Sequence, residues 1–135
     1  MKTVYYYQTF VGLKQLLSHV EDIDTIIISS IHFDKNKEGI SNIYLNDNLP
    51  NDTKFDGMWM ETKQISDQRG TILLMVGGAG GAYSNLFKDF NVYYPMLYNL
   101  LREQTHISGI DLDIEEDVTL ENVKMLIRKI REDFG

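Results

Sequence analysis

Hydrophobic and polar positions along the chain change repeatedly between the spacing of strands and the spacing of helices. Four short apolar or aromatic runs predict strands, at Thr3–Phe10, Asp24–Phe33, Thr71–Val76 and Ile107–Glu115. Four segments with apolar residues at helical spacing predict helices, at Gly12–Val20, Asp56–Gln68, Ser84–Thr105 and from Thr119 onward. Because strands and helices alternate, the sequence predicts an α/β fold with parallel strands and right-handed crossovers.

Three local features refine this prediction. Pro95 should kink or split the third helix, because proline removes a helical hydrogen bond. The segment Asp34–Phe55 is rich in Asn, Asp, Gly and Pro, so we expect a long loop there, with a small hairpin around Ile40–Leu45. Thr119 can cap the last helix, whose apolar stripe consists of Leu120, Val123, Leu126, Ile127 and Ile130.

The number of strand–helix units indicates the architecture. A complete eight-unit barrel needs about 250 residues, whereas this chain has 135 residues. We therefore expect one domain, residues 1–135, that consists of the first four strands and helices of a TIM barrel. A free-standing open sheet of four strands is the structural alternative.

Composition and charge exclude several classes of partner. Thirteen basic and twenty acidic residues give a net charge of −7, so no basic stripe is available for nucleic acid. No run reaches the roughly 18 apolar residues of a membrane span, and the N-terminus lacks the features of a signal peptide. We expect no membrane partner and, by default, an intracellular location, with export by a route that the sequence does not reveal as the alternative.

Metal-ligating and redox residues are scarce. The chain has no cysteine, which excludes disulfides and thiolate metal sites. His19, His32 and His106 are scattered without ligand spacing, and we expect them at the surface or at strand ends.

The segment Ser108–Glu115 carries the clearest candidate chemistry. Strand side chains alternate between faces, so Asp111, Asp113 and Glu115 should share one face of a buried strand. Carboxylates this close raise one another's pKa, which suits a general acid near neutral pH. A structural acid cluster, a site for Mg²⁺ or Ca²⁺, and the metal-binding D-x-D motif of nucleotide-sugar transferases are the alternatives.

Glycines and aromatic residues supply candidate substrate contacts. The loop Gly77–Gly81 follows the third strand but is neither a P-loop nor a G-x-G-x-x-G motif. Its glycines either make a tight turn only or let a ligand approach the backbone, with Gly77 and Gly78 as the candidates. Tyr6, Trp59 and Tyr83 can stack on sugar rings, and core packing is the alternative for Trp59.

The acid strand resembles the signature of glycoside hydrolase family 18, the chitinases and their relatives. That signature is D-G-x-D-x-D-x-E on the fourth barrel strand, and here it reads Ser108-Gly109-Ile110-Asp111-Leu112-Asp113-Ile114-Glu115. The third strand also ends in Gly77-Gly78, as in the family. Two departures are Ser108, in place of the first acid, and Met75, where many relatives have serine.

The resemblance implies a role for each acid. Glu115 matches the general acid/base, Asp113 the residue that orients the 2-acetamido group of the substrate, and Asp111 the deeper acid that supports Asp113. It implies substrate-assisted retaining hydrolysis of β-1,4-linked N-acetylglucosamine polymers such as chitin, without a cofactor or a metal. This mechanism is an exception to the scheme with two catalytic carboxylates.

The resemblance also implies that half of the site lies outside this chain. Relatives place a tyrosine, further acids and a tryptophan floor on later strands, so we expect residues 1–135 alone to have weak or no activity. Two other classes stay open. One is a non-catalytic carbohydrate-binding or structural module, and the other is a half-barrel that pairs with another chain through its exposed strand edges.

Overall fold

Four parallel strands form the sheet that organises the chain. A computed structural model describes residues 1–135 and gives the order β1 (Val4–Tyr7), β2 (Thr25–Lys35), β4 (Thr71–Gly77), β5 (Gly109–Asp113). A fifth strand, β3 (Ser41–Leu45), pairs antiparallel with β2. Strands and helices alternate along the chain, so the predicted α/β fold of a partial barrel is confirmed.

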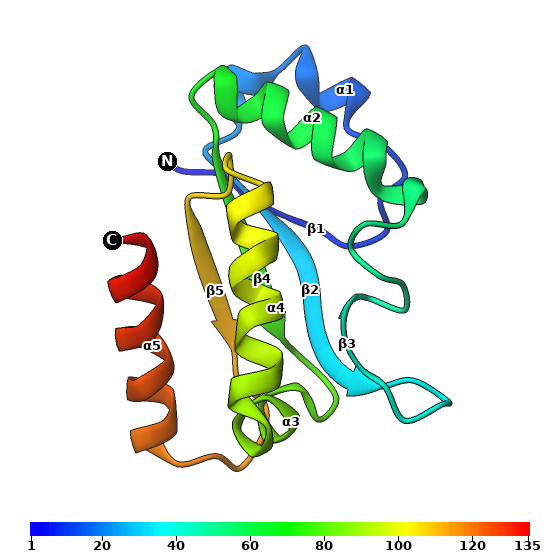
Figure 1. Ribbon diagram of the computed structural model, residues 1–135. Coiled ribbons are helices and arrows are strands. Elements are labelled where there is room, and N and C mark those ends of the chain that lie inside the picture. Colours follow the sequence, from blue (N-terminus) through cyan, green and yellow to red (C-terminus); the bar gives the residue numbers. More distant parts are fainter.

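Helices flank the sheet. They are α1 (Lys14–Leu17), α2 (Asp56–Asp67), α3 (Ala82–Lys88), α4 (Phe90–Glu103) and α5 (Leu120–Phe134), with short 3₁₀ turns η1 (Val20–Asp22) and η2 (Thr53–Phe55). In Figure 1, α4 crosses in front of the sheet, with α5 on one side of it and α1 and α2 on the other. None of these helices has the length and apolar character that crossing a membrane requires.

The core lies between the sheet and these helices. Alternate residues of the central strands, such as Ile26, Ile28, Ile72 and Leu74, have no exposed surface, and they pack in one cluster with Leu126 of α5. Burial of such side chains stabilises the fold by roughly 1.5–3 kcal/mol each. The opposite face of the central strands is also apolar at Ile27, Leu73 and Met75, and polar side chains gather at the carboxyl edge.

The predicted loop Asp34–Phe55 is wrong over its first part. β2 continues to Lys35 and forms a hairpin with β3, close to the hairpin expected around Ile40–Leu45. The strand extends because Phe33 and Leu45 both enter the core, at 1% and 0% exposure. Only the segment after Leu45 is a loop that leads into α2.

The predicted break at Pro95 is also wrong. The helical segment divides at Asp89, between α3 and α4, and Pro95 lies inside α4 without interrupting it. A proline leaves the carbonyl four residues earlier without its helical partner. Here that residue is Asn91, which is exposed, so water can bond its carbonyl.

The last strand and the start of the last helix are less buried than the sequence predicts. The strand with the acids is only partly buried, because β5 is the last strand of the sheet. The cap of α5 is confirmed, since the Thr119 hydroxyl accepts a hydrogen bond from the Asn122 N–H. Leu120, however, is 65% exposed, so the apolar stripe of α5 begins one turn later than predicted.

His106 links the segment before β5 to α2. Its Nε2 lies 2.9 Å from the Thr62 hydroxyl, and its ring lies edge-on to Trp59. Burial lowers the pKa of His106, and nearby Lys63 lowers it further. The folded state therefore prefers the neutral imidazole.

This preference predicts a pH-dependent stability. The unfolded state takes up a proton near its pKa of about 6.5, whereas the folded state does so only at lower pH. The free energy of unfolding should fall as the pH drops through this range, and His106→Gln should reduce the fall. Urea unfolding between about pH 7.5 and about pH 5 measures it. His19→Gln, at the exposed His19, is the control, and an unchanged slope in His106→Gln would contradict the prediction.

Candidate active site

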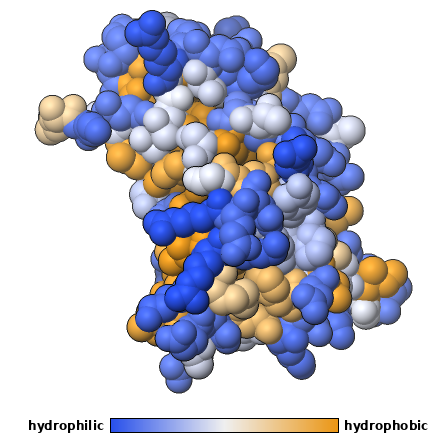
Figure 2. Space-filling view, turned by 60° about the vertical axis from the view of Figure 1, so that its left-hand side comes forward, coloured by the Kyte–Doolittle hydropathy of each residue, from blue (hydrophilic) through white to orange (hydrophobic).

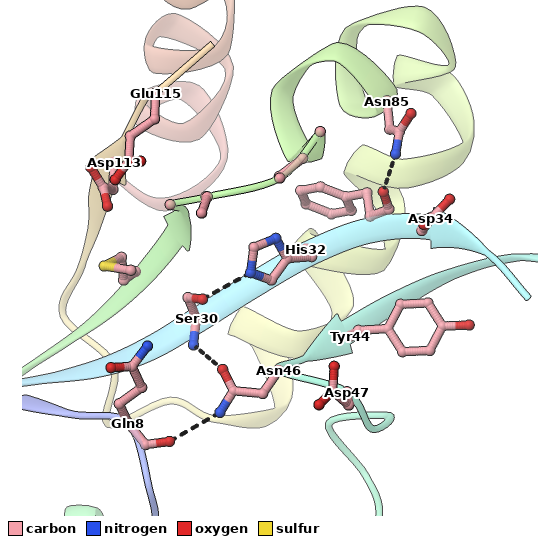
Figure 3. Close-up of a pocket in the computed structure, with 18 of the residues that line it drawn as sticks. Gln8, Ser30, His32, Asp34, Tyr44, Asn46, Asp47, Asn85, Asp113 and Glu115 are labelled. Atoms are coloured by element: carbon pink, nitrogen blue, oxygen red, sulfur yellow. Dashed lines mark hydrogen bonds between the residues drawn. The ribbon is translucent and has the colours of Figure 1, made fainter.

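The carboxyl ends of the strands surround a pocket of about 870 Å³. In α/β barrels, this end of the strands carries the active site. Residues of β2, β4, β5, the hairpin and α3 meet here with Gln8, which directly follows β1, as Figure 3 shows. The polar residues among them include Gln8, Ser30, His32, Asp34, Tyr44, Asn46, Asp47, Asn85, Asp113 and Glu115.

Two of the three predicted acids line this pocket. Asp113 is the last residue of β5, and Glu115 follows two residues later, where the chain has left the sheet and the side chain is exposed. Asp111 shares a face of β5 with Asp113 but lies one pleat deeper, outside the pocket lining. The structure thus brings Asp113 and Glu115 to one opening and places Asp111 beneath them.

These acids have no basic partner. The salt bridges of the chain are Lys63–Asp67, Lys124–Glu121 and Lys129–Asp133, all on the helices. The carboxylates of Asp111, Asp113 and Glu115 are also too far apart to hold one metal ion together. The one group of three possible metal ligands whose atoms lie within 4.8 Å of one another is the exposed set His19, Glu21 and Asp22. The site acids are therefore available to a substrate rather than neutralised by the protein.

The predicted glycines bring β4 and β5 together beside these acids. Gly77 and Gly78 have positive φ angles of 104° and 95°, and the Gly78 N–H donates a 2.9 Å hydrogen bond to the Asp113 carbonyl. A Cβ on Gly77 would overlap with the same carbonyl and with the ring of Tyr83. A Cβ on Gly78 would lie 3.6 Å from the Asp113 carboxylate. Gly77 is thus required for close packing of the two strands, and Gly78 leaves the backbone beside the Asp113 carboxylate uncovered.

The three predicted aromatic contacts lie outside the pocket lining. Tyr83 is fully buried and donates a hydrogen bond to the Val76 carbonyl, while burial, with Asp113 adding, raises its pKa far above the ordinary value. Trp59 is a core residue of α2 that donates its indole N–H to the Pro50 carbonyl. Tyr6 is 57% exposed on β1, at the edge of the sheet. A substrate-binding role for these residues stays a prediction.

Several pocket residues were not identified from the sequence. The Ser30 N–H donates to Asn46 Oδ1 at 3.1 Å, Asn46 Nδ2 donates to the Gln8 carbonyl at 3.1 Å, and the Ser30 hydroxyl lies 2.9 Å from His32 Nε2 (Figure 3). A signal was present, because Ser30, His32 and Asp34 alternate with apolar residues as the acids of β5 do. His32 lies half-buried inside the pocket, and the expectation of a surface or strand-end position is corrected.

Glu116 has a structural position next to Glu115. Its carboxylate accepts hydrogen bonds from the N–H groups of Tyr83, at 2.7 Å, and Ser84, at 2.9 Å. These are free donors of the first turn of α3, which an acidic side chain satisfies well. Glu115 therefore lines the pocket, whereas its neighbour Glu116 binds the N-terminal end of α3.

The two departures from the family signature also have local partners. Met75 lines the pocket, and its sulfur lies 3.6 Å from the hydroxyl of the buried Ser29. Ser108 lies just before β5, where its hydroxyl donates a 3.2 Å bond to the Ile72 carbonyl. Ser108 thus supports the sheet and takes no part in the pocket lining.

Solved structures with this fold support the resemblance seen in the sequence. No protein-family model matches the chain, and no curated protein has a significant sequence match. A chitinase from Aspergillus fumigatus matches 99% of the chain with a TM-score of 0.88 and 27% identity. A fungal endo-β-N-acetylglucosaminidase from glycosyl hydrolase family 18 matches 100% of it with a TM-score of 0.81 and 27% identity.

A GH18 chitinase from Pseudoalteromonas aurantia has a TM-score of 0.70 over the whole chain at 16% identity, which shows the fold alone. The resemblance to glycoside hydrolase family 18 is therefore confirmed by the first two structures, and the partial-barrel fold by all three. The chain spans about half the length of these structures, covering 51% of the first two and 52% of the third.

Gly77→Ala should destabilise the fold strongly. The added methyl group meets backbone and a buried ring at a positive φ angle, so we expect a loss of roughly 2–4 kcal/mol in the free energy of unfolding. Gly57→Ala is the matched control, because a Cβ there contacts nothing within 4 Å and alanine favours the helix. Denaturant unfolding compares the two, and equal stability would refute the packing argument.

Glu116→Gln should also lower stability, because it weakens two charge-assisted hydrogen bonds at the start of α3. We expect a loss of about 1–2 kcal/mol. Glu121→Gln, on an exposed turn of α5, is the control. A variant at Glu116 as stable as this control would show that the cap contributes nothing.

Proposed function

We propose that this chain, whose fold matches about half of a family 18 glycoside hydrolase, carries the catalytic acids of a glycosidase active site. Residues 1–135 are the N-terminal half of the barrel domain. The substrate is a β-1,4-linked N-acetylglucosamine polymer, such as chitin or its oligosaccharides. The observation that carries the proposal is the meeting of Asp113 and Glu115 at one pocket, beside the bare backbone of Gly78.

The proposed mechanism needs one proton donor and one orienting acid. Glu115 gives its proton to the glycosidic oxygen as the bond between this oxygen and the anomeric carbon breaks. The acetamide oxygen of the same sugar attacks the anomeric carbon and forms a cyclic intermediate. Water then opens this intermediate, and Glu115 takes the proton from the water. The two inversions retain the anomeric configuration.

Asp113 suits the orienting role in this scheme. Its carboxylate can accept a hydrogen bond from the acetamide N–H, which turns the acetamide oxygen toward the anomeric carbon and stabilises the positive charge that develops. Asp111, one pleat below on the same face of β5, is the supporting acid of this scheme. The exposed place of Glu115 at the pocket rim suits a group that exchanges protons with water.

A non-catalytic module that pairs with another half-barrel is the second candidate. The strands β1 and β5 are the outer strands of the parallel sheet, and open edges favour pairing. Beside β5 lies a groove of about 580 Å³ between α4 and α5, lined in part by Ile107, Ile110 and Ile130. Figure 2 turns this side forward and shows apolar surface between polar regions. This face suits a second set of strands and helices.

Glu115→Gln tests the proposal in the natural protein that contains this chain. The amide cannot donate the proton, so kcat on an N-acetylglucosamine oligosaccharide should fall by a factor of about 10² to 10⁴, with binding preserved. Glu121→Gln controls for the change of charge. Binding without any turnover by the wild type would favour the carbohydrate-binding module, and unchanged turnover in the variant would remove Glu115 from the mechanism.

A further inference from the structure

Met75 is the one methionine in the lining of the pocket at the carboxyl edge of the sheet. It is 8% exposed, and it pairs in register with Asp111 on the neighbouring strand β5. The other methionines lie outside the pocket lining, and they are Met1, Met58, Met60, Met96 and Met125. The pocket, with a volume of about 870 Å³, easily admits a molecule as small as a peroxide. The thioether of Met75 can therefore be reached from solvent.

A bulge in β2 places a buried hydroxyl group against this thioether. The register between β2 and β4 shifts after Ile28, so that Ser29 and Ser30 of β2 together lie opposite Met75 of β4. An extra residue of this kind changes the direction of the side chains around it. Ser29 is 2% exposed, and its hydroxyl points to the sulfur of Met75 at 3.6 Å.

The hydroxyl of Ser29 has only weak hydrogen-bond acceptors. They are the Ile27 carbonyl, at 3.5 Å, and the Met75 sulfur, at 3.6 Å. An ordinary O–H···O bond is about 2.7–2.8 Å long, and a thioether is a weak acceptor. A buried donor in this situation is stabilised by any stronger acceptor that comes within reach. An oxygen atom bound to the Met75 sulfur would be such an acceptor.

We propose that Met75 is an oxidation site, at which a hydroperoxide such as hydrogen peroxide converts the thioether to a sulfoxide and lowers activity at the pocket. The sulfur lone pair attacks one peroxide oxygen, and the S–O bond forms as the O–O bond breaks. The sulfur loses two electrons. The second oxygen takes them, together with both peroxide protons, and leaves as water. The Ser29 hydroxyl then donates a hydrogen bond to the sulfoxide oxygen.

The oxidised side chain would disturb the surroundings of Asp113. A Cβ on Gly78 would lie 3.5 Å from the Met75 methyl group and 3.6 Å from the Asp113 carboxylate, so both groups flank the same bare backbone. A sulfoxide is larger and more polar than a thioether, and the negative end of its dipole lies in a row with Asp111. The loss of activity rests on the proposed function, because it acts through the acids, whereas the oxidation itself does not.

The test treats the natural protein that contains this chain with increasing concentrations of hydrogen peroxide. Peptide mass spectrometry measures the fraction of each methionine that has gained one oxygen atom, and initial rates on an N-acetylglucosamine oligosaccharide measure activity. Met75 should be oxidised well before Met58, which is 3% exposed in the core and outside the pocket. Activity should fall about 10- to 100-fold, in proportion to the oxidised fraction of Met75.

Three variants isolate the roles of the sulfur and of the hydroxyl, each compared with its own untreated activity. Met75→Leu removes the sulfur at similar volume and should keep its activity at peroxide concentrations that inactivate the parent. Met60→Leu is the matched control, because Met60 is 59% exposed and outside the pocket, and it should be inactivated as the parent is. Ser29→Ala should slow the oxidation of Met75 roughly fivefold relative to Met60, the effect of one hydrogen bond on a rate.

The outcomes separate this inference from the proposed function. Oxidation of Met75 no faster than that of Met58 in the parent overturns the oxidation site, and this comparison needs no variant to fold. Equal inactivation of Met75→Leu and the parent overturns the effect on the pocket and leaves the proposed function standing. An untreated parent without activity overturns the proposed function, while mass spectrometry still decides whether Met75 is oxidised.

Discussion

The close approach of β4 and β5 at their carboxyl ends is the constraint on which the site depends. Gly77 has no side chain where the Asp113 carbonyl and the Tyr83 ring need the space, and the Gly78 N–H bonds that carbonyl. This contact fixes where β5 ends and therefore where Asp113 points. Glu115 follows two residues later, so its position is inherited from the same contact. Any larger residue at this point would separate the acids from the glycine loop.

One short helix ties the remaining parts of the site to this contact. The first N–H groups of α3 donate hydrogen bonds to Glu116. The Tyr83 hydroxyl of this helix donates to the end of β4, and the Asn85 side chain donates to the hairpin. The segment after β5 that carries Glu115 and Glu116, the end of β4 and the β2–β3 hairpin thus share a single support in α3. Such support is what positions reactive groups accurately, because a shift of an ångström at an active site is costly. Helix α3 itself contributes only Ala82 and Asn85 to the pocket lining, so its contribution is mainly positional.

Repulsion between the carboxylates of β5 reduces the stability of this edge of the sheet. Asp111 and Asp113 point the same way from one strand, and neither forms a salt bridge. Placing like charges together without a counter-ion reduces stability, and a sequence optimised only for folding would avoid it. The partly exposed position of β5 moderates this cost, since water reaches the carboxylates. The β2–β3 hairpin, on the other side of the pocket, adds the polar side chains of His32, Asp34 and Tyr44, which can form hydrogen bonds with a neutral, hydroxyl-rich ligand.

The sequence by itself determined the main order of strands and helices, the cap at Thr119, the shared face of Asp111 and Asp113, and the glycine turn after the third predicted strand. These features depend on spacing along the chain and on the conformational freedom of single residues, and both are local. Tertiary structure decided that Tyr83 and Trp59 are buried, that Pro95 stays inside a helix, and that His32 and Tyr44 enter the pocket. These outcomes depend on which distant segments pack together. The alternation of Ser30, His32 and Asp34 along β2 indicated a polar face, but only pairing with β3 and β4 showed what that face lines.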